Sequence, residues 1–189
     1  MKKQVTLVIE HCESQLSEWL LLEYRHAVKL WRGDVVFTNV HDTKTANELS
    51  KLGRTEHKQA NKVFHGKRCI ILDPQAKNPL KTKDFSYLDA LIVGGILGYE
   101  QPQGRTKTLL SDTSDFETRH LGPLQLTIDS AVFVAQAIAF GMNLRDIEIT
   151  YEIEIVHDQV HSTVLPFGYP VVGETAIITP GLVEYLSRE

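Results

Sequence analysis

Only two cysteines, Cys12 and Cys69, occur in the 189 residues, and they do not form a CxxC motif. We therefore expect two reduced thiols and no disulfide. The sequence also lacks a long apolar run near its start, so we expect a cytoplasmic protein with no signal peptide and no membrane contact. Glycine motifs of the GxGxxG and GxxxxGK[ST] types are missing, which removes the main support for nicotinamide-cofactor and P-loop nucleotide binding.

Histidines offer little sign of a metal centre. His157 and His161 are four residues apart, a spacing that serves metal binding on a helix. However, this part of the chain is predicted to be a strand or a loop, in which the two rings would point in unrelated directions. We therefore expect no metal site.

Charge is distributed unevenly along the chain, although its net charge is only -4. Residues 51–68 contain one acid, Glu56, and six bases, namely Lys51, Arg54, Lys58, Lys62, Lys67 and Arg68. Residues 146–189 reverse the balance, with many acids and Arg188 as the only base. The basic segment is a candidate for RNA contact, whereas the acidic tail disfavours phosphate backbones and suits a cationic partner. Either segment could also be an ordinary solvated surface.

Alternating strand and helix patterns predict the fold class. Apolar runs of the kind found in buried strands occupy residues 5–11, 34–40, 69–74 and 88–95,. Helical spacing covers residues 14–31, 43–53 and 128–140, with Thr127 as the expected N-cap of the last helix. A short helix is expected in residues 104–112. The final part is predicted as a strand (147–156), a Pro/Gly loop (165–173) and a closing helix (180–186). This order favours an α/β fold with a mainly parallel sheet flanked by helices.

Three loops at predicted strand ends carry the clearest functional signal. Gly94, Gly95 and Gly98 follow a buried strand, and glycine lets the backbone approach a ligand closely. The LDP motif at residues 72–74 ends the preceding strand, and HLGPLQLT precedes the apolar helix. Because the carboxyl ends of parallel strands share one edge, these loops are expected to converge on one ligand.

At these motifs the sequence resembles a known family. EHCESQLSEWLLLEY, LDP, GGILG with PQGRT, RHLG with QLTIDSAV, and LPFGY are similar to segments of the SPOUT class of S-adenosylmethionine (SAM)-dependent methyltransferases. Within that class they resemble most the SPOUT protein-arginine methyltransferases known from fungi, with archaeal relatives. The resemblance implies a trefoil knot in the C-terminal half, a methyltransferase domain over residues 1–145, and an acidic extension over residues 146–189 that packs on it.

The resemblance also implies a cofactor site made of the three knot loops. Its residues contact SAM largely through their backbone, and no metal is needed. Carried over position by position, they are Leu72, Pro74, Gly94, Gly95, Gly98, Leu121, Gly122, Gln125, Leu126 and Thr127.

Methylation of arginine requires a carboxylate, because the guanidinium stays protonated and must be held and relieved of a proton. Glu10, Glu18 and Asp129 are the candidates and are expected to face one cleft. Each has an alternative reading: a solvated strand end, an exposed helix face and a helix-dipole acid, respectively. Arg105 could pair with these carboxylates or with the carboxyl group of the cofactor.

Three further residues are candidates for binding the substrate. Arg119 could pair as Arg105 does, or only tie a loop to the fold. Trp19 could wall the substrate pocket, although an aromatic residue on the apolar face of a helix often belongs to the core. His120 could form a hydrogen bond to the substrate.

The predicted function is SAM-dependent methylation of an arginine side chain on a protein, with a small-subunit ribosomal protein as the substrate that the resemblance suggests. Two alternatives stay open: an RNA methyltransferase that uses residues 51–68 to contact phosphates, and a noncatalytic ribosome-associated binding protein. The chain is expected to act as a monomer or a homodimer.

Overall fold

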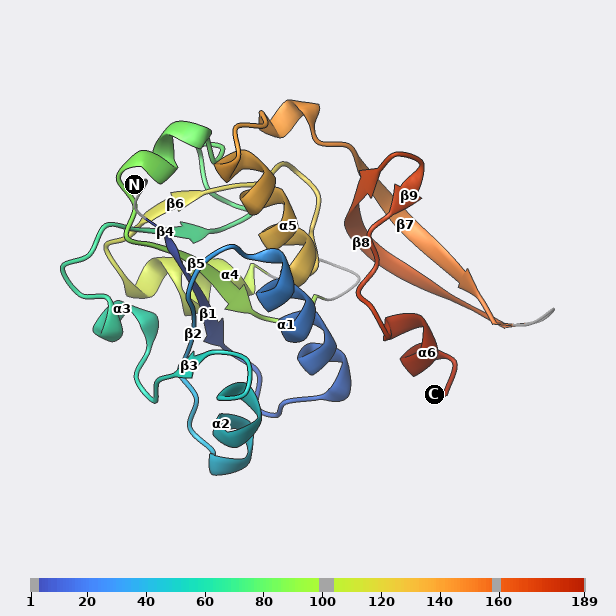
Figure 1. Cartoon of the computed structure of the whole chain (residues 1–189), viewed down its shortest axis with the longest axis horizontal. Helices are drawn as coiled ribbons and strands as arrows, with labels where there is room; N and C mark the ends of the chain where they lie inside the picture. Colours follow the sequence, from blue (N-terminus) through green and yellow to red (C-terminus); the bar gives the residue numbers. More distant parts are fainter. Residues whose placement is uncertain (1–3, 99–103, 158–160, 189) are drawn as a thin grey trace.

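A six-stranded parallel sheet forms the centre of the protein. The computed structural model describes residues 4–98, 104–157 and 161–188. The strands are β1 (Thr6–His11), β2 (Val35–Thr38), β3 (Arg54–Thr55), β4 (Cys69–Leu72), β5 (Ala90–Gly95) and β6 (Glu117–Arg119). Their order across the sheet is β3-β2-β1-β5-β4-β6 (Figure 1). The predicted mainly parallel α/β architecture is confirmed.

Each face of the sheet packs against helices, which explains why the strands are apolar without alternation. Helices α1 (Glu18–Leu30), α2 (Thr43–Leu49) and α5 (Ile128–Ala139) cover the face that carries Leu7 and Ile9. On the opposite face, Val8 packs with Ala60 of α3 (Ala60–Val63) and with Leu110, which follows α4 (Arg105–Leu109). Both cores are therefore built from the same strands.

Side-chain caps begin two of the helices that flank the site. Ser17 Oγ accepts a hydrogen bond from Leu20 N at the start of α1, at 3.1 Å. Thr127 Oγ1 accepts from Ser130 N at the start of α5, at 3.3 Å. Such caps satisfy donors that a helix terminus otherwise leaves unpaired. The predicted role of Thr127 as N-cap is confirmed.

A smaller antiparallel sheet follows α5 and projects beyond α1 and α5 (Figure 1). It consists of β7 (Ile149–Val156), β8 (Ser162–Val172) and β9 (Thr175–Ala176), and α6 (Leu182–Leu186) comes after it. Tyr169 and Leu182 are buried in the core of this unit, against which Trp19 of α1 packs. The C-terminal unit therefore docks on α1.

One prediction about local structure is wrong. The Pro/Gly loop expected at residues 165–173 lies mostly in β8. The strand tolerates Pro166 because the pairing shifts register between Tyr151 and Ile153, and this irregularity takes Pro166 out of the regular ladder,. The short strand β6 occupies residues for which no element was predicted. The trefoil knot that the resemblance implies stays a prediction. No helix in the described ranges is long and apolar enough to cross a membrane.

Candidate functional site

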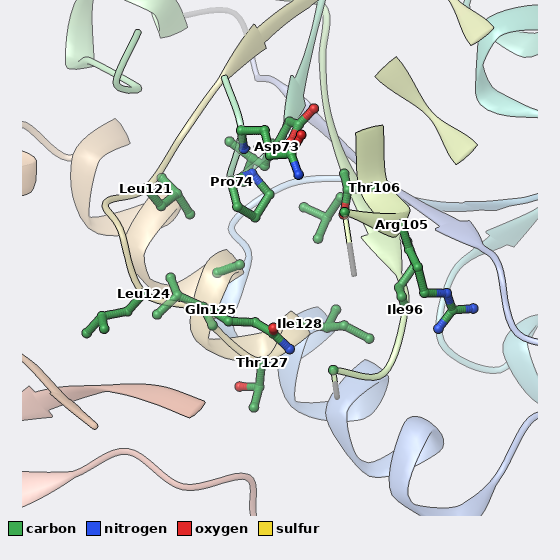
Figure 2. Close-up of a pocket in the computed structure, with 18 of the residues that line it drawn as sticks. Asp73, Pro74, Ile96, Arg105, Thr106, Leu121, Leu124, Gln125, Thr127 and Ile128 are labelled. Carbon is green, nitrogen blue, oxygen red and sulfur yellow. Dashed lines mark hydrogen bonds between the residues drawn. The ribbon is translucent and has the colours of Figure 1, made fainter. Parts of the chain in front are cut away.

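A cavity of about 330 Å³ lies where β4, β5 and β6 end. Pro74 and Asp73 border it on one side, Leu121 and Gln125 on another, and Ile96 lies across from them (Figure 2). This volume falls within the range of ~300–1,000 Å³ that is usual for small-molecule sites. The carboxyl edge of a parallel sheet is the expected place for such a site.

Nine of the ten residues predicted to hold a cofactor line this cavity. They are Leu72, Pro74, Gly94, Gly98, Leu121, Gly122, Gln125, Leu126 and Thr127. The exception is Gly95, where a Cβ atom would overlap the hydroxyl of buried Tyr24. The structure thus gives Gly95 a packing role and brings the other predicted residues together.

Two glycines keep the backbone close to neighbouring side chains in the cavity wall. A Cβ atom at Gly98 would overlap Gln125 Nε2 and the ring of Phe167. A Cβ atom at Gly94 would lie 2.9 Å from Ile96 Cδ1. Larger residues at these positions would therefore fill space that now belongs to the cavity or its wall.

Arg105 lies at the edge of the cavity, but its guanidinium points away from the centre (Figure 2). It forms a two-pronged ion pair with Glu13, with N–O distances of 2.8 and 3.3 Å. Glu13 Oε1 also accepts a hydrogen bond from Leu97 N at 3.0 Å. Sequence reasoning gave Glu13 no role, although the residue lies in the EHCESQ motif. The pair fixes the loop that follows β5.

Asp73 is another cavity residue that sequence reasoning missed. Its side chain is buried, and its two oxygens accept hydrogen bonds from Gln75 N at 2.8 Å and from Ser111 Oγ at 2.6 Å. Because each carboxylate oxygen can accept two hydrogen bonds, Asp73 can still accept from a ligand hydroxyl. Its place in the LDP motif, directly after a buried strand, was the available signal.

Two buried acids, Glu23 of α1 and Asp129 of α5, lie beneath the cavity floor. Glu23 Oε2 accepts from the backbone N–H of Ile128, a lining residue, at 2.9 Å. Glu23 Oε1 accepts from Trp19 Nε1 at 2.6 Å. Glu23 is therefore joined directly to the cavity wall, and sequence reasoning missed it because Ile128 is distant in the chain.

Asp129 ties three elements together rather than facing the cavity. Its Oδ2 atom lies 2.7 Å from His26 Nδ1 and accepts from Thr179 Oγ1 at 2.6 Å. Its Oδ1 atom accepts from Thr127 Oγ1 at 2.7 Å and from Ser130 N at 3.0 Å. These contacts link α1 and the segment before α6 to the start of α5, where the cavity lining lies.

Burial, and to a lesser degree the neighbouring Asp129 carboxylate, raises the pKa of Glu23 to about 8. Burial likewise raises the pKa of Tyr169, with smaller contributions from Glu23 and Asp129. The Tyr169 hydroxyl is buried and has no hydrogen-bond partner among the residues that the structure describes. The site thus contains a carboxyl group that exchanges its proton near neutral pH.

The raised pKa of Glu23 predicts how stability depends on pH. Between its ordinary value of 4.5 and about 8, the folded protein keeps a proton that the unfolded chain releases. The free energy of unfolding should therefore fall as pH rises through this range. Urea denaturation at several pH values should show a shallower fall for Glu23→Gln than for the wild type. An equal slope in both proteins would contradict the assignment.

The expectation that Glu10, Glu18 and Asp129 face one cleft is wrong. Glu10 is buried and accepts from Thr38 Oγ1 and from Ala60 N, so it anchors α3 on the other side of the sheet. Burial raises the pKa of Glu10. Glu18 is exposed on the first turn of α1 and forms an ion pair with Arg188.

The three residues predicted to contact substrate do not line the cavity. Arg119 forms ion pairs with Asp84 and Glu117 and so ties β6 to the fold. His120 Nδ1 accepts from Gly122 N at 3.0 Å and shapes the turn before α5. Trp19 makes an edge contact with the ring of Tyr185, in addition to its hydrogen bond to Glu23.

The C-terminal unit supports one wall of the cavity. Gly168 N of β8 donates to Gln125 O at 2.8 Å, and Leu126 forms a bridge with Gly168. Phe167 packs against the Gly98 backbone from the same strand. Phe167 and Gly168 of the LPFGY motif therefore lie beside two of the loops that were predicted to bind the cofactor.

The basic segment at residues 51–68 is partly neutralised. Lys51 pairs with Glu48 at 2.7 Å, Arg54 with Glu56 at 3.5 Å, and Arg68 with Asp89 at 3.6 Å. Half of its six bases thus have an acidic neighbour, which weakens the segment as a track for phosphates.

Pro102 and Gln103 of the PQGRT motif lie outside the described residues.

Comparison with known proteins agrees with this geometry. Yeast (Saccharomyces cerevisiae) protein arginine N-methyltransferase SFM1 is 27% identical in an alignment 201 residues long. The alignment covers 96% of this chain and 94% of that protein. The crystal structure of yeast SFM1 complexed with SAM has a TM-score of 0.86 and 28% identity, covering 98% of this chain and 91% of that one. Its complex with SAH has a TM-score of 0.85, covering 96% and 94%.

A more distant neighbour shares the fold alone. The dual specific Trm10 of Thermococcus kodakaraensis has a TM-score of 0.59 and 15% identity, covering 74% of this chain and 95% of that one. The family model described as protein arginine N-methyltransferase SFM1-like matches residues 6–189. The chain therefore belongs to the SFM1-like family of protein arginine N-methyltransferases.

Proposed function

We propose that this protein transfers a methyl group from SAM to an arginine side chain of a protein, with a small-subunit ribosomal protein as its substrate. The main support is the cavity at the ends of β4, β5 and β6, in a chain that matches the SFM1-like family along nearly its whole length. The acidic C-terminal segment suits a cationic protein better than RNA,.

The residues of the cavity fit SAM. Leu72, Leu121 and Leu126 line the cavity and would supply apolar contacts to the adenine ring of bound SAM, and Gly94 and Gly98 would let the backbone approach the cofactor. Asp73 is placed to accept hydrogen bonds from hydroxyl groups of the ribose. The ion pair between Arg105 and Glu13 holds the loop after β5 in position. When bound, SAM supplies an electrophilic methyl group.

Glu23 is the proposed catalytic carboxylate. An arginine guanidinium that approaches from the side of Trp19 would replace the indole N–H as the donor to Glu23 Oε1. Trp19 is partly exposed, so a shift of its ring uncovers this oxygen. The positive charge of the arriving guanidinium would lower the pKa of Glu23 and release its proton to solvent. The resulting carboxylate would hold the charged fork and accept the proton that the guanidinium loses on methylation.

The raised pKa of Glu23 suits this role. A carboxylate with the ordinary value of 4.5 would be a weak acceptor, whereas burial raises the pKa of Glu23 to about 8. A base works best when its pKa lies near the operating pH. Asp129 contributes by its negative charge, and its hydrogen bonds hold the start of α5 beside Glu23.

A labelled-methyl experiment tests the proposed activity. Purified protein, labelled SAM and ribosomes from the source organism are incubated, and the protein and RNA fractions are counted separately. We expect label in a protein band that survives nuclease and yields methylarginine after acid hydrolysis. Label confined to RNA would overturn the proposed acceptor. Absence of label in both fractions, with SAM bound, would favour a noncatalytic binding protein.

A further inference from the structure

Two histidines meet at the carboxyl edge of the sheet, away from the cavity. His41 follows β2 and His57 follows β3, whereas the cavity lies at β4, β5 and β6. Their Nδ1 atoms are 3.2 Å apart. The ring centroids are 4.4 Å apart and the rings are nearly perpendicular, at 88°. Both side chains are exposed, so a small ion can reach them from solvent.

Asn39 fixes which nitrogen of His41 carries the proton. Asn39 Nδ2 donates to His11 O at 2.7 Å, and this contact orients the amide so that Oδ1 faces His41 Nε2 at 2.8 Å. Because Oδ1 can only accept, Nε2 of a neutral His41 must donate. The Nδ1 atom of His41 therefore presents a lone pair toward His57.

The pair is held on a rigid support. Asn39 N donates to Lys58 O at 3.0 Å, and Val40 N donates to Glu56 O at 3.1 Å, so the two loops are joined backbone to backbone. Asn39 has a φ of 62°, in the left-handed region that non-glycine residues seldom occupy,. Asparagine is enriched in this region among non-glycine residues, so this residue type suits the position.

We infer that His41 and His57 bind a divalent transition-metal ion through their Nδ1 atoms. Bonds of about 2.0–2.1 Å from a tetrahedral ion to two imidazole nitrogens place those nitrogens about 3.3 Å apart, close to the distance observed. A histidine ligand usually donates its other N–H to a fixed acceptor, as His41 does to Asn39,. Imidazole suits Zn²⁺, Ni²⁺ and Cu²⁺.

The rest of the coordination shell is water. Among the residues that the structure describes, no group of three or more histidine, cysteine, aspartate or glutamate side chains is arranged to hold a metal. Asp42, next to His41, is engaged as the N-cap of α2. The site is therefore an open one that binds and releases its ion reversibly.

Zn²⁺ titration by isothermal calorimetry, after treatment of the whole protein with a chelator, tests the site. The wild type should bind Zn²⁺ through a step that is lost in both His41→Ala and His57→Ala. Asn39→Ala should weaken this binding by about 10–100-fold, because it removes the partner that orients His41.

His65→Ala is the matched control, since His65 is exposed and belongs to neither loop. This variant should bind Zn²⁺ as the wild type does. Unchanged binding in His41→Ala or His57→Ala would overturn the inference and assign the ion to another site. No detectable binding by the wild type would also overturn it and leave the pair as two rings that share a proton.

Discussion

Glu23→Gln is expected to lower kcat for methyl transfer by about 10²–10⁴-fold, the usual contribution of a positioned acid or base. Glutamine is similar in shape, and its carbonyl oxygen can still accept from Ile128 N or Trp19 Nε1. It cannot accept a proton or balance the charge of a guanidinium. The effect should therefore fall on the chemical step, and affinity for SAH measured by calorimetry should stay close to that of the wild type.

Glu18→Gln provides the matched control for this prediction. It makes the same chemical change on the same helix, but at an exposed carboxylate paired with Arg188. Single-turnover kinetics should show a normal rate for Glu18→Gln. A Glu23→Gln variant that retained the wild-type kcat would exclude Glu23 as the proton acceptor, while leaving the methyltransferase activity itself intact.

Gly98→Val is expected to abolish binding of SAM and SAH. Any Cβ atom at this position would overlap Gln125 Nε2 and the ring of Phe167, and the two extra methyl groups of valine would enter the cavity or push Phe167 outward. Close-packed surroundings tolerate such added volume poorly. Calorimetry with SAH measures the loss directly, and circular dichroism tests whether the variant is folded.

Gly66→Ala separates loss of binding from loss of stability. Gly66 has a φ of +74°, so alanine there strains the backbone. Beyond its chain neighbours, however, no atom of the described residues lies within 4 Å of the added Cβ, and Gly66 is not part of the cavity lining. This control should be slightly less stable and bind SAH normally. A folded Gly98→Val protein with normal SAH affinity would show that the cofactor does not occupy the cavity.

The architecture and the cavity loops were predictable because they depend on local patterns. Buried strands such as β1 and β4 are continuous apolar runs, and Thr127 is a typical N-cap before an apolar helix,. In the sheet, β4, β5 and β6 are neighbours in the order β5-β4-β6. The glycine- and proline-containing loops that follow these three strands therefore meet at one edge of the sheet. Nine of the ten predicted cofactor residues line the cavity for this reason.

The partners of charged side chains could not be predicted, since they come from distant parts of the chain. Glu10 looks like a solvated strand end, but Thr38 and Ala60 enclose it. Glu23 looks like one more acid on the surface of a helix, and its role depends on Ile128, which is 105 residues away. Burial and pairing of this kind are properties of the packed molecule and have no signature in local sequence.

The hydrogen bond from Gly168 N to Gln125 O has a consequence for how the protein folds during its synthesis. This support for the cavity loop comes from β8, which follows α5 and β7 in the chain. During translation, a nascent chain would therefore lack this support for its binding loop until β8 had left the ribosome.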